Sequence, residues 1–132
     1  MKDKWIPALF IFVGMVEFAI GLSFILFPDR IFALSGIAPI QAVEYVQFPA
    51  LLIMVFGLMM FNIARDPARN LNLILYVCLF KAAFISVVFY NWFTRGLPLL
   101  WIAFSFFDVA YLAGFILTYR VIRLHSAENS LK

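Results

Sequence analysis

Long apolar runs separated by short polar breaks dominate the chain. The runs cover residues 5–27, 48–65, 71–93 and 99–122. A helix needs about twenty apolar residues to cross the hydrocarbon core of a bilayer, and each run has close to that length. The pattern therefore predicts an all-α fold, a four-helix transmembrane bundle in which residues 1–132 form one integral membrane domain.

The longer break after the first run predicts a short helix and a kinked second span. Asp29 is placed to cap a helix over residues 30–35, whose apolar positions suit the membrane interface and which Gly36 would end. Pro39 suits the first turn of the next helix. Pro49 lies inside that helix, where a proline removes a backbone hydrogen bond and kinks the chain.

A polar face opens the second helix ahead of its proline. An amphipathic segment in this position can dock a protein partner or form the mouth of a pocket, and the sequence leaves both open. The residues of this possible docking surface are Gln41, Glu44 and Tyr45.

Two compact turns separate the remaining spans. Asp66 is placed as an N-cap with Pro67 after it, so we expect the third helix to begin there. Gly96 and Pro98 are placed to end the third helix and to open the fourth. Turns this short favour antiparallel neighbouring helices.

Three charges interrupt the apolar runs, namely Glu17, Lys81 and Asp108. Each lies roughly ten residues from an end of its run, which is near the bilayer midplane. A charge there costs about 2.5–3.5 kcal/mol on insertion scales. An acid and a base ~4 Å apart attract by ~4 kcal/mol at an effective dielectric of 20. We therefore expect Lys81 to contact at least one acid, with Asp108 as the main partner and Glu17 neutral or sharing the lysine.

Small and polar residues accompany these charges at helical spacing. Gly14 and Gly21 flank Glu17 on one face, where small residues let another helix approach closely. Ser105 and Tyr111 lie three residues on either side of Asp108 and share its stripe. The predicted intramembrane charge cluster or ligand-binding site consists of Glu17, Lys81, Asp108, Ser105 and Tyr111.

Composition excludes a soluble domain, because 66% of the residues are hydrophobic and 13% are charged. The net charge of +3 reflects membrane topology, and no nucleic-acid partner is expected. With a cytoplasmic N-terminus, the positive-inside rule is satisfied by seven basic residues against two. Both termini are predicted to be cytoplasmic, in a bacterial inner membrane. The cytoplasmic set is Lys2, Lys4, Arg65, Arg69, Arg120, Arg123 and Lys132, and the other side holds Arg30 and Arg95.

Several chemistries lack the residues that they need. Cys78 is the only cysteine, so neither a CxxC pair nor an intrachain disulfide can form. It has no support as a metal ligand, because the only histidine, His125, lies in the tail. The loops are too short for a catalytic lid and no cofactor signature is present. These features argue against an enzyme and predict no catalytic residue, metal or cofactor, apart from a bound quinone or lipid.

The overall pattern resembles the DoxX-like small four-helix membrane proteins. The resemblance rests on four spans with a polar centre and on the segment from Gly14 to Gly36, with its glycine-flanked acid and the Phe-Pro-Asp-Arg break that follows. It implies an accessory role beside redox enzymes, and it assigns no catalytic residue.

Two functions follow from the sequence. The favoured one is an accessory or structural subunit of a larger membrane assembly, such as a respiratory or electron-transfer complex. The alternative is a protein that binds a quinone, sterol or lipid, or passes a proton, through its charged centre. Membrane lipids and other membrane-protein subunits are the expected partners.

Overall fold

The protein is all-α over residues 3–131, the part of the chain that the computed structural model describes. Four of its five helices in this range are long and apolar enough to cross a membrane, which confirms the predicted bundle. Lys2 and Lys132, which belong to the predicted cytoplasmic set, lie outside the described residues. The helices are α1 (Trp5–Leu26), α2 (Pro28–Leu34), α3 (Glu44–Arg65), α4 (Leu71–Arg95) and α5 (Leu99–Ser130).

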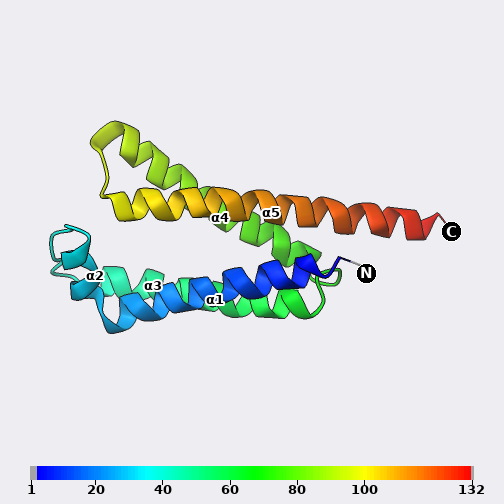
Figure 1. Cartoon of the computed structure of the whole chain (residues 1–132), viewed down its shortest axis with the longest axis horizontal. Coiled ribbons are helices and arrows are strands. Elements are labelled where there is room, and N and C mark those ends of the chain that lie inside the picture. The colour runs from blue at the N-terminus through cyan, green and yellow to red at the C-terminus, as the bar shows by residue number, and fades with distance from the viewer. Residues whose placement is uncertain (1–2, 132) are drawn as a thin grey trace.

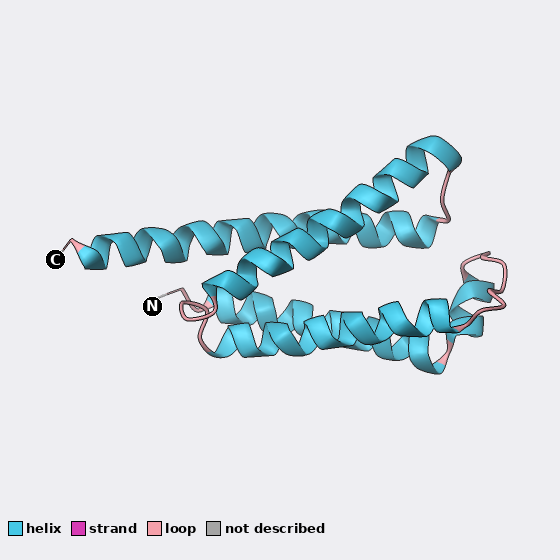
Figure 2. Cartoon of the chain, turned by 180° about the vertical axis from the view of Figure 1, so that it is seen from behind, coloured by secondary structure: helices cyan, strands magenta, loops and turns pink. Residues whose placement is uncertain are grey.

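The long helices form two hairpins. Helix α1 packs along α3, and α4 packs against α5 (Figure 1). Helix α4 crosses α5 obliquely, so that its C-terminal end rises away from the first hairpin (Figure 2). Both termini lie at the same end of the molecule as the turn between α3 and α4 (Figure 1). We call this the terminal end, and the opposite one, which carries α2, the α2 end.

Glycines set the close approach of α1 to α3. A Cβ atom added to Gly57 would lie 2.8 Å from the carbonyl oxygen of Gly14, and one added to Gly21 would lie 2.5 Å from the carbonyl oxygen of Ala50. Backbone therefore meets backbone at two levels of this hairpin, as small residues allow in membrane helices. The predicted role of Gly14 and Gly21 as helix-contact positions is confirmed.

Two apolar clusters make up the core, one toward each end of the bundle. The cluster at the α2 end is built on Phe24, Phe32 and Ala50. The larger one, at the terminal end, is built on Ile6, Phe10, Val13, Met60, Ile63, Ile74, Val77, Phe115 and Ile122. The three intramembrane charges lie in the interval between the two clusters.

The short second helix differs from the prediction at its start. It begins at Pro28 instead of residue 30, because the fixed φ of proline suits the first helical position, and the Asp29 side chain makes no capping hydrogen bond. Its end is as predicted. Gly36 has φ +67°, and the Ile37 N–H donates to the carbonyl of Phe32 at 2.9 Å, which is a Schellman motif.

Three other helix boundaries correct the prediction. Helix α3 begins at Glu44, well after Pro39, whose stretch is non-helical. Helix α4 begins at Leu71 instead of Pro67. The Asn70 side chain donates to the Asp66 carbonyl at 2.8 Å, and this local bond favours a turn over a helical start. Helix α5 continues past residue 122 to Ser130, because nothing in this polar segment breaks a helix.

Replacement of Gly21 by alanine is expected to lower thermal stability. The new methyl group would meet the Ala50 carbonyl oxygen and the Met54 side chain, each at 2.5 Å, so the α1–α3 hairpin must open. Overpacking of this kind costs about 1–3 kcal/mol. Gly114→Ala is the control, because its methyl group meets only the flexible end of Leu9, at 3.1 Å. Equal melting temperatures for the two variants in mild detergent would contradict the close approach.

Candidate functional site

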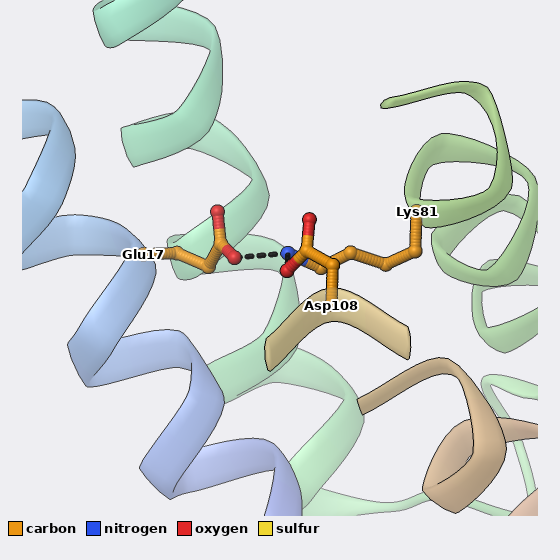
Figure 3. Close-up of polar contacts among 3 residues, drawn as sticks. All are labelled: Glu17, Lys81 and Asp108. Atoms are coloured by element: carbon orange, nitrogen blue, oxygen red, sulfur yellow. Dashed lines mark hydrogen bonds and ion pairs between the residues drawn. The ribbon is translucent and has the colours of Figure 1, made fainter. Parts of the chain in front are cut away.

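Lys81 on α4 is the centre of the candidate site. Its side chain is 1% exposed, and its ammonium donates hydrogen bonds to Glu17 Oε1 and, at 2.7 Å, to Asp108 Oδ1. Glu17 projects from α1 and Asp108 from α5, and both carboxylates point toward the ammonium (Figure 3). The predicted contact is confirmed, and of the two alternatives for Glu17 the structure has the one in which it shares the lysine with Asp108.

Aromatic pairs position the two acids at the same level. Phe10 of α1 stacks on Phe115 of α5 at 4.9 Å, and Phe24 of α1 stacks on Trp101 of α5 at 6.0 Å. Phe10 and Phe24 each lie seven residues from Glu17, and their partners each lie seven residues from Asp108. Seven residues are about two helical turns, so this antiparallel register places Glu17 opposite Asp108.

Besides the two carboxylates, two aromatic rings lie close to the Lys81 ammonium. The Lys81 Nζ atom lies 5.5 Å from the ring centroid of Phe80 and 5.7 Å from that of Tyr111. Both distances fall within the range in which a ring face attracts a cation. Phe80 in turn stacks on Phe56 of α3 at 4.0 Å, so all four long helices contribute to the surroundings of the charge.

A cavity of about 240 Å³ adjoins the charge cluster. It is bounded by all three charged residues and by Tyr111, with apolar and aromatic side chains over the rest of its wall. A second cavity, of about 330 Å³, extends toward the α2 end, where Tyr45 and Pro49 line it. The two cavities share the side chains of Ile20, Ile53, Phe80, Phe84 and Phe104, and we call the combined space the central cleft.

The other predicted residues divide between the central cleft and the remainder of the protein. Tyr111 and Tyr45 line the cleft, whereas Gln41 and Glu44 are exposed and do not. Ser105 is fully buried but lines neither cavity, and its hydroxyl has no hydrogen-bond partner among residues 3–131. The structure therefore does not bring Ser105 to the ligand-accessible side of the cluster.

Sequence reasoning missed the aromatic wall of the cleft. Phe80 and Phe84 flank Lys81 on α4, and Phe104 and Phe107 precede Asp108 on α5. Their spacing from the charges was visible in the sequence. With 17 phenylalanines in the chain, however, nothing distinguished these four from residues that face lipid.

The charge cluster has hydrogen-bonding capacity that its own members do not use. The Lys81 ammonium has three N–H groups and uses two of them in the bonds to Glu17 and Asp108, so one N–H is left over. Each carboxylate also has an oxygen that does not bond to the lysine. No group of three metal-ligating side chains occurs among the described residues. The cluster therefore offers hydrogen-bond donors and acceptors in an apolar space.

Comparison of the chain with protein-family models, with curated proteins and with solved structures finds no match.

Substitution of Lys81 by methionine is expected to destabilise the protein by about 3–5 kcal/mol, because it strands two buried carboxylates. Adding Asp108→Asn should recover part of the loss, and adding Glu17→Gln as well should recover most of it, since no uncompensated charge is then left. Thermal unfolding in mild detergent measures all three variants. If the multiple variants are as unstable as the sum of the single ones, the three residues do not act as one ion-paired group.

Proposed function

We propose that the protein binds an amphiphilic small molecule within the membrane. The central cleft carries this proposal: an aromatic space that ends on the ion-paired group of Glu17, Lys81 and Asp108. Binding sites for small molecules are mostly apolar, with a few polar groups that orient the ligand. The polar head lies at the ion-paired group, and the apolar body lies toward the α2 end.

The chemistry of the site favours a head with a carbonyl or hydroxyl group. Lys81 donates to a carbonyl oxygen, and the outer oxygens of Glu17 and Asp108 accept from a hydroxyl group. The phenylalanine side chains of the wall suit a flat ring or an isoprenoid chain, because both pack well against aromatic faces. Quinones, sterols and lipids with a small head have this combination of features.

The position of Tyr45 provides the cleft with a mouth. This side chain is 77% exposed, yet it borders the larger cavity beside Ile40 and Pro49. The proline at this point has no N–H to bond with the carbonyl of Tyr45, which loosens the helix beside the mouth. Of the two roles that the sequence left open for the start of α3, the mouth of a pocket is the one we adopt.

Native mass spectrometry of protein extracted in mild detergent tests the proposal. We expect a retained molecule of low mass, and we expect Ile20→Trp to reduce its occupancy strongly, because Ile20 borders both cavities. Leu22→Trp is the matched control: it lies on the same helix, is 39% exposed and borders neither cavity. Equal retention by the two variants would place the ligand elsewhere and contradict the proposal.

The accessory-subunit hypothesis stays a prediction that the same preparation tests. Gln41, Glu44 and Tyr45 are all exposed at the α2 end, as a docking surface for another membrane subunit requires. If other subunits co-purify in constant ratio and no small molecule is retained, the result would support the accessory-subunit hypothesis and contradict ligand binding.

The proposed location is a bacterial inner membrane with both termini in the cytoplasm. At the terminal end, the described basic residues near or beyond the ends of the spans are Lys4, Arg65, Arg69, Arg120 and Arg123, against Arg30 and Arg95 at the α2 end. Cytoplasmic loops carry an excess of lysine and arginine, which supports this orientation. A reporter fused at the C-terminus should therefore be cytoplasmic, and one inserted between Gly96 and Leu97 should be external. An external C-terminus would overturn this topology.

A further inference from the structure

A second groove, separate from the central cleft, lies between α4 and α5 toward the terminal end. Its volume is about 530 Å³, and it shares no lining residue with either cavity of the cleft. Leu75 and Cys78 of α4 and Ile116 and Leu124 of α5 provide most of its apolar wall. Two cations, Arg120 and Arg123, complete its polar part together with Tyr119.

The depth of these residues matches the layers of a bilayer. With Asp108 near the midplane, Ile116 lies about 12 Å along α5 toward the terminal end, inside a hydrocarbon half of about 15 Å. Arg120 and Arg123 lie about 18 and 22 Å from the same level, which is the depth of the lipid head groups. The apolar part of the groove therefore faces acyl chains, and its arginines face phosphates.

The two arginines of the groove have no acidic partner in the described part of the chain. Neither Arg120 nor Arg123 forms an ion pair with a carboxylate among residues 3–131. The closest contact of this kind at this end is between His125 Nδ1 and a carboxylate oxygen of Asp3, at 3.9 Å, and it involves neither arginine. Two neighbouring guanidinium groups in this layer attract an anion, and arginine binds phosphate oxygens in a bidentate manner.

We infer that this groove is a binding site for an anionic phospholipid. The phosphate and the anionic head group lie at Arg120 and Arg123, and one acyl chain lies in the apolar wall between α4 and α5. Basic pockets between transmembrane helices bind lipid head groups in this way. A zwitterionic lipid fits the apolar wall equally well, but its cationic head group offsets the attraction to the arginines.

Lipid titration followed by native mass spectrometry tests the site on the full-length protein. We expect phosphatidylglycerol to bind more tightly than phosphatidylcholine with the same acyl chains. Arg120→Gln with Arg123→Gln should weaken phosphatidylglycerol binding by about 30-fold, because each basic residue near an anionic head group contributes about 5-fold and the two factors multiply. Both arginines are exposed, so these substitutions leave the folded bundle intact.

Arg65→Gln with Arg69→Gln is the matched control, because both residues are exposed at the same end and neither lines the groove. Equal loss in the two double variants would show attraction to the whole basic surface and overturn the site. Equal affinity for the two lipids in the unmodified protein would also overturn it.

A substitution within the apolar wall tests the position of the acyl chain. Ile116→Trp should fill the groove and reduce phosphatidylglycerol binding with both arginines present, whereas Leu117→Trp, on the same turn but outside the groove, should not. Undiminished binding by Ile116→Trp would show that the lipid lies elsewhere. The site is independent of the central cleft, so its failure would leave the proposed function untouched.

Discussion

The fold depends on neutralising one lysine in the middle of the membrane. Lys81 belongs to the second hairpin, and its bond to Glu17 reaches across to the first, so the ion-paired group joins the two halves of the bundle. An isolated charge at this depth is costly, and separation of the hairpins would leave Lys81 with Asp108 alone and strand Glu17 in lipid. The hairpins also pack through the apolar cluster at the terminal end and through the stacked pairs Phe10–Phe115 and Phe24–Trp101. The ion pairs and the stacked rings of Phe10 and Phe24 on either side of them together set the register of the two hairpins.

Helix α1 contacts its own hairpin partner, α3, and the second hairpin through one stripe of buried residues. Gly14 and Gly21 form one edge of the stripe and meet the backbone of α3, while Glu17, with a phenylalanine two turns away on each side, forms the other edge and faces α5. The two kinds of contact require opposite residue sizes. Glycine permits the close α1–α3 hairpin, and the large rings hold α5 farther away. The space left between the hairpins is where the central cleft forms.

The sequence was sufficient for the spans and for the charged centre, but not for the cavities. Hydrophobic run length predicts transmembrane helices well, because backbone groups in lipid must be satisfied within the helix. The contact of Lys81 with the acids followed from their common depth and the cost of burying charge. Helix starts were less predictable from aspartates placed as N-caps. The side-chain bond of Asn70 to the Asp66 carbonyl favours a turn before α4, and the fixed φ of Pro28 starts α2 one residue before Asp29. The cleft depends on how the helices cross, including the oblique path of α4, and a helical pattern contains no information on crossing angle.

The location of the cleft bears on why the charges are present. A buried ion pair is weak evidence for stability, because well-packed apolar residues of similar volume are often as stable or more so. A purely structural group would also be expected in a close-packed setting, since voids reduce stability. Here the group opens on a cavity of about 240 Å³ that runs on toward Tyr45, so the protein retains both the costly charges and the adjoining space. Binding of a polar head group by the charges would explain why buried charges and a cavity occur side by side. A solely structural role for the charges leaves the cavity unexplained.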